Sequence, residues 1–293
     1  MAAASPLANP TATKEMLERF GLATKHRLGQ NFLIDNHVIE HILELASLTE
    51  DDYVVEVGPG IGTLTLGLLS QAGHVVSIEA DHELEPVLEE HESLHENFSF
   101  IMGDALKVSV DQMAGCLDGH KPNILVSNLP YNVAATIILQ YFQQNPEQQA
   151  CVVMVQKEVA DRICATPGNK IYGAYTAKLN LYGHVTGRFE VPPRCFMPAP
   201  HVDSAVVRID RNVSEIDLGS GGMTLEYCAR VIDAAFAQRR KTIRNSMSAS
   251  GFDKQMLDQA FEASNIAPTS RAEKLSCEEF VTLSRALFEL ESQ

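Results

Sequence analysis

The alternation of short apolar strands with helical segments between residues 53 and 156 most constrains what this chain can fold into. Parallel strands need long crossovers, and helices are the usual crossover. The pattern therefore favours a mainly parallel sheet with helices on both faces, an α/β fold. The expected strands cover residues 53–57, 75–79, 98–102, 123–127 and 150–156, and the expected helices 35–46, 62–71, 82–92 and 133–142.

Two later strand patterns, residues 184–191 and 203–210, have no helix between them, so we expect them to pair as a hairpin. The stretch 214–222 then breaks the periodicity with Gly219, Gly221 and Gly222, which indicates a linker. Every later periodic segment is helical, and the expected helices cover residues 224–237, 240–249, 253–263 and 276–290.

These boundaries predict three parts of the chain. Residues 1–24 form an N-terminal extension with a short helix at 13–20, and residues 25–212 form the α/β domain. Residues 222–293 form a small, all-helical C-terminal domain.

The first strand leads into a glycine turn, V-V-E-V-G-P-G-I-G-T-L-T at residues 54–65. Glycines such as Gly58 and Gly60 let the backbone approach a ligand at the carboxyl end of the strand. Glu79 ends the next strand, where an acid can bind both hydroxyls of a ribose. Dinucleotide enzymes share these features, so a nicotinamide dehydrogenase stays open at this point.

Three further features argue against the dehydrogenase. The spacing is G-x-G-x-G rather than G-x-G-x-x-G, and Pro59 stiffens a turn in which a pyrophosphate needs open backbone donors. Asp104 follows the third strand, where it can meet an adenine amino group. The run N-L-P-Y-N at residues 128–132 ends the fourth strand. Four strand ends thus carry ligand-type residues, and in an open α/β sheet these ends share one crevice.

The N-L-P-Y run predicts chemistry on the exocyclic amino group of a base. This nitrogen is a poor nucleophile because its lone pair is delocalised into the ring. Two acceptors, the Asn128 side-chain oxygen and the Leu129 carbonyl, would favour a tetrahedral nitrogen, and Tyr131 can stack on an unstacked base. A methyl donor supplies the electrophile, so positioning and dipoles carry most of the catalysis.

In sequence order, V-E-V-G-P-G-I-G-T-L-T, I-E-A-D, G-D-A-L and N-L-P-Y-N resemble the motifs of S-adenosylmethionine-dependent methyltransferases that act on adenine amino groups. The segments G-Q-N-F-L (29–33) and V-Q-K-E-V-A-D-R (155–162), the run 192–209 and F-A-Q-R-R-K-T-I-R-N-S (236–246) narrow the resemblance. From about residue 25 to 290 the chain is similar to the KsgA-type ribosomal RNA small-subunit adenine dimethyltransferases. The resemblance implies a Rossmann-like, seven-stranded class I methyltransferase domain followed by a small helical domain.

The same resemblance implies roles for individual residues. The cofactor S-adenosylmethionine would contact Asn31, Leu33, Gly58, Gly60, Glu79, Asp104 and Asn128. The target base would be held by the catalytic set Asn128, Leu129 and Tyr131. Phe196 is either a second aromatic wall for the base or a packing residue. The RNA backbone would contact Lys157, Arg239, Arg240, Lys241 and Arg244.

The charge distribution suits an RNA partner despite a net charge of −15. Residues 35–118 contain 18 acidic side chains and one basic side chain, Lys107, whereas Q-R-R-K-T-I-R-N (238–245) has four cations and no acid. Such polarity suits a protein that offers one basic face to a polyanion, although a solvated charged surface stays open. His91 and His95 lack a third ligand nearby, so a solvated helix face is expected there rather than a metal site.

We expect a cytoplasmic protein that acts as a monomer without a metal. No stretch of the sequence approaches the roughly 18 apolar residues of a membrane span. The six cysteines have no metal-ligand spacing, and the N-terminus lacks the basic and apolar regions of a leader.

The expected activity is dimethylation of two adjacent adenosines in the 3′-terminal hairpin loop of 16S ribosomal RNA, with immature 30S subunits as partner and a role in late 30S biogenesis. Two competing functions stay open. One is that of a large-subunit adenine methyltransferase of the macrolide-resistance type. The second is that of a ribosome-assembly factor with vestigial catalysis.

Overall fold

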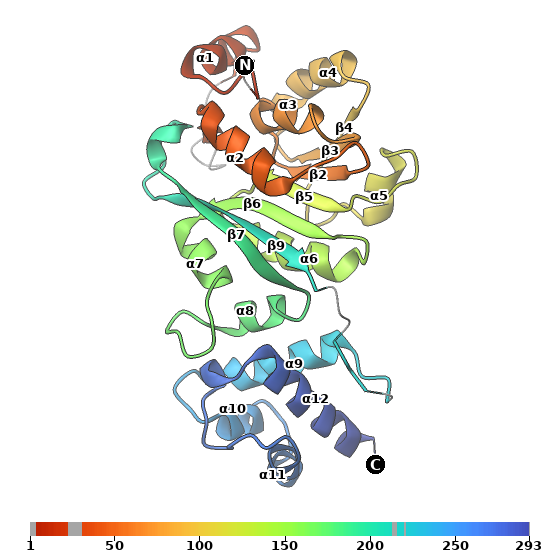
Figure 1. The fold of residues 1–293 in the computed structure, drawn as a ribbon, viewed down its shortest axis with the longest axis vertical. Helices are drawn as coiled ribbons and strands as arrows, with labels where there is room; N and C mark the ends of the chain where they lie inside the picture. Colours follow the sequence, from red (N-terminus) through yellow and green to blue (C-terminus); the bar gives the residue numbers. More distant parts are fainter. Residues whose placement is uncertain (1–3, 23–30, 213–215, 220, 293) are drawn as a thin grey trace. The chain divides into compact units, whose positions relative to one another are not determined.

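The computed structural model describes residues 4–22, 31–212, 216–219 and 221–292. The chain forms two compact units (Figure 1), residues 1–160 with 185–211 and residues 161–184 with 212–293. The segment 161–184 was predicted within the α/β domain, but in the structure it belongs to the second unit. The predicted domain boundaries themselves stay a prediction.

A seven-stranded sheet forms the centre of the first unit, with the order β4-β3-β2-β5-β6-β9-β7 (Figure 1). The pairs from β4 through β6 are parallel, and β9 joins β6 antiparallel. The predicted mainly parallel sheet is confirmed, and the two hairpin strands are neighbours at one edge. The strands are β2 (Tyr53–Val57), β3 (His74–Glu79), β4 (Phe98–Met102), β5 (Ile124–Asn128), β6 (Ala150–Gln156), β7 (Gly183–Val191) and β9 (Ser204–Arg211).

Helices lie on both faces of this sheet, with α2, α3 and α4 above it and α6 below it in Figure 1. The N-cap of α2 is Asp35, which accepts a hydrogen bond from the His37 N–H, and the predicted apolar stripe of this helix is buried. The helices are α1 (Pro10–Arg19), α2 (Asn36–Ala46), α3 (Thr63–Leu69), η2 (His82–Leu84), α4 (Glu85–Leu94), α5 (Val110–Gly115), α6 (Ala134–Gln144) and α7 (Lys157–Ile163).

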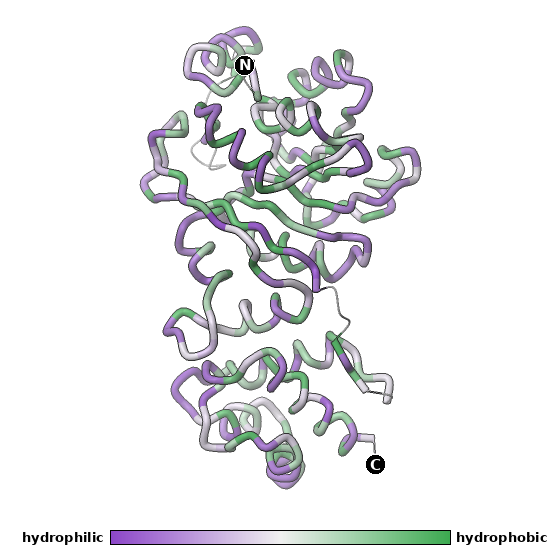
Figure 2. The backbone as a smooth tube through the Cα atoms, viewed as in Figure 1, coloured by the Kyte–Doolittle hydropathy of each residue, from purple (hydrophilic) through white to green (hydrophobic). Residues whose placement is uncertain are grey.

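The core of the first unit lies between the sheet and its helices. Strands β2 and β6 are buried almost throughout, because helices cover both faces of the sheet. Figure 2 shows the resulting hydrophobic strands at the centre of this unit. A separate two-stranded sheet pairs β1 (Phe32–Leu33) with β8 (Phe196–Met197), which follows η3 (Pro193–Cys195).

The second unit is helical, as predicted. Its elements are α8 (Ala174–Leu179), α9 (Leu225–Phe236), α10 (Ile243–Ala249), α11 (Lys254–Ala263), η4 (Ala272–Lys274) and α12 (Cys277–Glu291). The Tyr172 ring packs 6.0 Å from that of Phe236, and its hydroxyl donates to the Leu275 carbonyl at 3.1 Å. These contacts explain why the segment 161–184 belongs to this unit.

The expected helix over 240–249 is wrong in its first turn. Helix α10 begins only at Ile243, after the N-cap Thr242, whose hydroxyl accepts from the Asn245 N–H. The Lys241 N–H donates to the Gln238 carbonyl at 2.9 Å, so residues 238–241 form a turn, and Arg240 and Lys241 lie outside the helix in which they were expected. Within the described part of the chain, no helix is long and apolar enough to cross a membrane.

Candidate active site

The sheet opens between β2 and β5, at the point where the strand order reverses. The ladder pairs Val54 with Ile124 and Val55 with Leu125 and ends there. Beyond it, the Ser127 hydroxyl donates to the Val57 carbonyl at 2.6 Å and accepts from the Val57 N–H at 3.3 Å. The side chain thereby satisfies backbone groups that would otherwise be buried without partners. This divergence is where open α/β sheets bind ligands.

A cavity of about 580 Å³ lies at this edge. It brings together most of the residues predicted to touch a cofactor or a base, although they come from four strand ends and the segment before α2. Its lining includes Asn31, Leu33, Gly58, Gly60, Glu79, Asp104, Asn128, Leu129 and Tyr131. Their individual roles stay predictions.

The glycine turn forms one wall of the cavity. Gly58 and Gly60 have φ angles of 71° and 60°, a left-handed conformation that favours glycine. A Cβ atom on Gly60 would lie 3.2 Å from the Phe32 ring, which leaves no room for a side chain without movement. The turn therefore brings bare backbone to the ligand side of the strand.

Glu79 is a buried acid on the same wall, with 7% of its surface exposed. One carboxylate oxygen accepts from the N–H groups of Ala80 and Asp81 at 2.8 and 2.9 Å, and the other accepts from the Gly60 N–H at 3.3 Å. Burial raises the pKa of this carboxyl, while the three backbone donors oppose that shift. The acid is thus fixed in place and keeps lone pairs for a ligand's hydroxyls.

A second buried acid, Glu56, lines the cavity and was missed from the sequence. It accepts from the hydroxyls of Thr65 at 2.6 Å and Ser77 at 2.8 Å. Burial raises its pKa to about 7, although both hydroxyls act to lower it. The sequence feature that could have revealed this residue is an acid inside the apolar strand V-V-E-V, because a charge in a buried strand needs a partner.

The N-L-P-Y turn forms another part of the cavity lining. The Leu129 N–H donates to the Met154 carbonyl at 3.1 Å, and the Pro130 carbonyl accepts from the Ala134 N–H at 3.1 Å, which ties the turn to β6 and α6. The Tyr131 hydroxyl lies 3.1 Å from the Ser204 hydroxyl on β9. Within the described residues the Asn128 amide makes no hydrogen bond, so its oxygen is available to a ligand.

Two more observations bear on a nucleoside-type ligand. The Thr63 residue lines the cavity, and its hydroxyl is buried without a hydrogen-bond partner among the described residues, so it can pair with a bound group. Asp104 is exposed at the rim, where one of its oxygens accepts from the Leu106 N–H at 3.0 Å. Both residues fit a ligand that carries several hydrogen-bonding groups along its length.

Phe196 does not line the cavity. It pairs with Leu33 across the β8–β1 sheet and is 3% exposed in the hydrophobic core. Of the two roles expected for this residue, packing is the one its position fits. Contact with a base stays a prediction.

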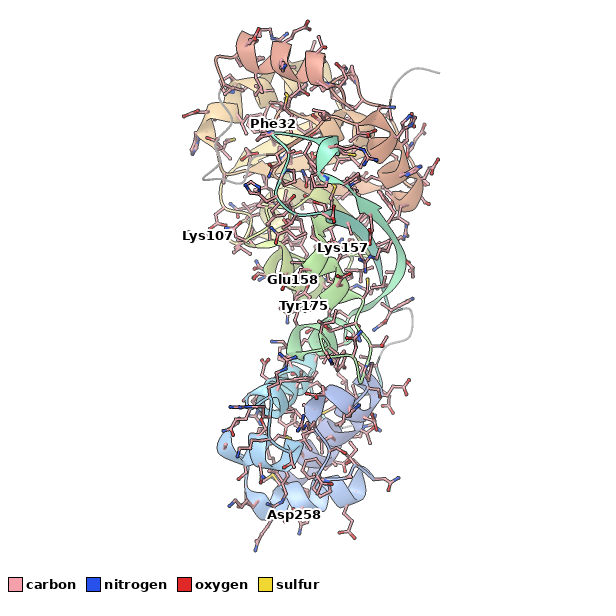
Figure 3. All side chains as sticks on the ribbon, turned by 90° about the vertical axis from the view of Figure 1, so that its left-hand side faces the viewer. Phe32, Lys107, Lys157, Glu158, Tyr175 and Asp258 are labelled. Atoms are coloured by element: carbon pink, nitrogen blue, oxygen red, sulfur yellow. The ribbon has the colours of Figure 1, made fainter. Side chains whose placement is uncertain are left out.

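The predicted RNA-binding residues lie outside the cavity lining and differ in their environments. Lys157, labelled in Figure 3, forms an ion pair with Glu190. Arg239 donates to the Lys170 carbonyl at 2.5 Å. Arg244 donates to both carboxylate oxygens of Asp258, at 2.5 and 2.7 Å.

Arg240 and Lys241 are exposed, and neither forms an ion pair within the described part of the chain. Of the predicted basic residues, these two are therefore open to a polyanion. Their contact with RNA stays a prediction.

The expectation of a solvated helix face at His91 is wrong. This side chain is 4% exposed, and its Nε2 lies 3.0 Å from the Ile61 carbonyl in the glycine turn. Burial lowers the pKa of the imidazole, which favours the neutral ring. Among the described residues no group of three or more His, Cys, Asp or Glu side chains is placed to hold a metal, and the expected lack of a metal stays a prediction.

The chain matches a family model described as ribosomal RNA adenine dimethylase over residues 21–288. The chain belongs to this family. The resemblance drawn from the sequence motifs is therefore confirmed. The ribosomal RNA small subunit methyltransferase A of Clostridium botulinum is 39% identical over 278 residues, which cover 95% of this chain and 99% of the relative.

Solved structures confirm the fold of this dimethylase-family chain as a Rossmann-like class I methyltransferase fold with a helical C-terminal part. A dimethyladenosine transferase from Plasmodium falciparum superposes with a TM-score of 0.73 at 23% identity, covering 86% of this chain and 95% of that one. The 23S rRNA methyltransferase ErmE superposes with a TM-score of 0.66 at 25% identity, covering 88% and 99%.

Proposed function

We propose that this protein uses S-adenosylmethionine to dimethylate the exocyclic amino groups of two adjacent adenosines in the 3′-terminal hairpin loop of 16S ribosomal RNA. The observation that carries the proposal is one cavity with two kinds of wall. Gly58, Gly60 and Glu79 form a wall suited to a nucleoside cofactor, and Asn128 and Tyr131 form a wall suited to a base. The 39% identity to a ribosomal RNA small subunit methyltransferase, over 95% of this chain, supports small-subunit RNA as the substrate.

The residues present fit the cofactor. Glu79 is held by three backbone N–H groups and would accept hydrogen bonds from the ribose hydroxyls. The Thr63 hydroxyl, which has no hydrogen-bond partner among the described residues, offers a further polar contact, and the bare backbone at Gly58 permits close approach. Asp104 at the rim would meet the adenine amino group. When bound, S-adenosylmethionine supplies an electrophilic methyl group.

The other wall would present the target amino group. Its two hydrogens would be accepted by the Leu129 carbonyl and by the Asn128 oxygen, which has no hydrogen bond within the described part of the chain. This arrangement favours a tetrahedral nitrogen whose lone pair points toward the cofactor side. The hydrogen bond to Ser204 holds the Tyr131 ring in one orientation, so the ring is ready to stack on the base. Catalysis then rests on positioning and on fixed dipoles rather than on a strong base.

Binding of the RNA would rest on phosphate contacts outside the cavity. Arg240 and Lys241 are the best placed of the predicted basic residues, because Lys157 and Arg244 already pair with acids. We propose that the protein acts as a cytoplasmic monomer on immature 30S subunits, and that the modification belongs to late 30S biogenesis.

The test is transfer of radiolabelled methyl groups from S-adenosylmethionine to 30S subunits from cells that lack this modification. Primer extension should then stop at two adjacent adenosines near the 3′ end of 16S RNA. The same assay on 50S subunits tests the large-subunit alternative, for which ErmE is a structural neighbour. Absence of transfer to 30S subunits at every assembly stage would contradict the proposal and favour an assembly factor with vestigial catalysis.

A further inference from the structure

The N-terminal segment before the family's matched region packs on the wall of the cavity. Residues 4–22, here called the N-terminal strap, lie almost wholly outside the family match, which begins at residue 21. The strap consists of a turn over residues 5–8, closed by a hydrogen bond from the Ala8 N–H to the Ser5 carbonyl at 3.2 Å, followed by helix α1. It has no part in the proposed reaction, yet Figure 3 places Phe32 between this helix and the central strands.

Hydrogen bonds tie the strap to α2 and fix its turn to α1. The Ser5 N–H donates to the Asn36 side-chain oxygen at 3.0 Å, which ties the strap to the start of α2. The buried Thr13 hydroxyl donates to the Leu7 carbonyl at 3.0 Å, which ties the turn to α1. Asn9 caps α1 by accepting from the Ala12 N–H at 2.8 Å. The strap is therefore an ordered element with specific anchors.

Apolar side chains of the strap join a core cluster that reaches the cavity. Two members come from the strap, and the others come from β1, the glycine turn and the η2–α4 segment. The cluster consists of Leu7, Leu17, Phe32, Ile61, Leu84 and Val87. Phe32 and Leu84 also line the cavity, and Ile61 is flanked by two glycines of the turn. The cluster thus joins the strap to the residues that line the cavity.

The link between strap and glycine turn runs through Phe32. Its ring sits against Gly60, where an added Cβ atom would be 3.2 Å away. The Gly60 N–H in turn donates to Glu79, the acid expected to hold the ribose. Interiors are packed closely, so loss of support behind Phe32 would let the ring and the turn shift together. A site whose supporting residues are loose binds its ligand less well.

We propose that the N-terminal strap is a positioning element for the cofactor pocket. By filling the space behind Phe32 and Ile61, it holds the glycine turn and Glu79 in the geometry that binds the cofactor. The inference rests on the proposed function, because it assumes that this cavity binds S-adenosylmethionine. It adds residues that touch neither cofactor nor RNA but set cofactor affinity.

The test compares two strap variants with a matched control by calorimetry with S-adenosylhomocysteine and by thermal melts. Leu17→Ala truncates the strap's contact with the cluster, and Thr13→Val removes the hydrogen bond to Leu7 with little change of shape. Leu287→Ala truncates a fully buried leucine of α12 in the second unit. We expect Leu17→Ala to raise the Kd about fivefold or more and Thr13→Val to raise it by less. Leu287→Ala should lower the melting temperature and leave the Kd unchanged.

The outcomes separate this inference from the function on which it rests. Wild-type Kd values in both strap variants, with lowered melting temperatures, would show a merely structural strap and overturn the inference. If Leu17→Ala does not fold, Thr13→Val alone serves as the test, and a wild-type Kd in this variant would overturn the inference. Equal losses of affinity in the strap variants and in Leu287→Ala would also overturn it, because general destabilisation would then explain them. Failure of the wild-type protein to bind S-adenosylhomocysteine would instead overturn the proposed function.

Discussion

The backbone N–H of Gly60 donates a hydrogen bond to the carboxylate of Glu79 at 3.3 Å. This bond joins the glycine turn after β2 to the acid that ends β3, two features that the sequence separates by 19 positions. The acid therefore has two tasks in one place. It anchors the turn, and it offers acceptors to a ligand in the cavity.

Replacing Glu79 should weaken cofactor binding for both reasons. In Glu79→Gln, an amide nitrogen facing Gly60 would place donor against donor, and one acceptor for the ribose would be lost. Hydrogen bonds to charged groups contribute roughly 1.5–3 kcal/mol, so affinity for S-adenosylhomocysteine should fall at least about tenfold by calorimetry. Glu79→Ala should lose at least as much. The exposed Glu89→Gln removes the same charge and should bind normally; unchanged affinity in folded Glu79→Gln would refute the assignment.

Asn128 should matter for chemistry and little for RNA affinity. Its amide oxygen is free to accept from the target amino group, whereas affinity for RNA rests on phosphate contacts. Asn128→Ala should lower the methyl-transfer rate about 100-fold or more, in the range seen when one fixed polar contact to a reacting group is removed. RNA binding should stay near the wild-type level.

Asn128→Asp is the informative companion variant. It keeps acceptor oxygens at the same position, so it should retain more activity than Asn128→Ala in single-turnover assays. Near wild-type turnover in the alanine variant would mean that another group positions the amino nitrogen.

Glu56 predicts a pH dependence of stability. Its folded-state pKa, raised by burial to about 7, lies above the ordinary value of 4.5. The folded state therefore holds this proton more tightly than the unfolded state does. Its stabilising contribution is complete below about pH 4.5 and is lost as the pH rises through about 7. Stability should decline across this window because the carboxylate must ionise in a buried site.

The neutral variant Glu56→Gln lacks this titration. The difference in unfolding free energy, variant minus wild type, should move in favour of Glu56→Gln by about 2 kcal/mol between pH 5 and pH 8. Denaturant titrations at both pH values measure this difference, in which most other ionisable groups cancel. A difference that does not change with pH would mean that Glu56 is ionised throughout this range.

The side chains of the basic run should have two different roles: Arg240 and Lys241 should bind RNA, and Arg244 should stabilise the fold. Arg240 and Lys241 are exposed without ion-pair partners in the described residues, whereas Arg244 is paired with Asp258. Arg240→Ala with Lys241→Ala should weaken binding to 30S subunits and reduce the salt slope of log K by about two units at most. The melting temperature should not change.

Arg244→Ala is the comparison variant for the same surface. It should lower the melting temperature, because Asp258 loses its partner, while the salt slope stays close to that of the wild type. A normal slope in the double variant would leave Arg240 and Lys241 without a role in RNA binding.

Local sequence patterns were enough to predict most elements of the fold. Strand β6 is a run of six apolar residues followed by Gln156, too short for a typical helix and rich in valine, and the stripe on α2 repeats with helical period. The sequence also placed the glycine turn, Glu79 and the N-L-P-Y run at strand ends. Carboxyl ends of parallel strands share one edge, so their convergence on one cavity follows from the order of elements.

Other features depended on contacts that no local pattern encodes. The strands β1 and β8 are two residues each and pair across more than 160 positions of the chain, too short to show a period. The expected helix over 240–249 started too early, because Thr242 caps α10 within the basic run and the helix begins only at Ile243. His91 was expected to be solvated, but in the structure it is buried because α4 places its ring against the Ile61 carbonyl of the glycine turn.

The sequence by itself therefore determined which candidate ligand-binding residues stand at the strand ends, because residue type and position along each strand are local properties. Only the tertiary structure decided which of them are free to do so. Pairing of Lys157 with Glu190, packing of Phe196 against Leu33 and support of Phe32 by the N-terminal strap all arise between segments far apart in the chain. Burial and pairing depend on distances in space, and only the fold brings such segments within reach of one another.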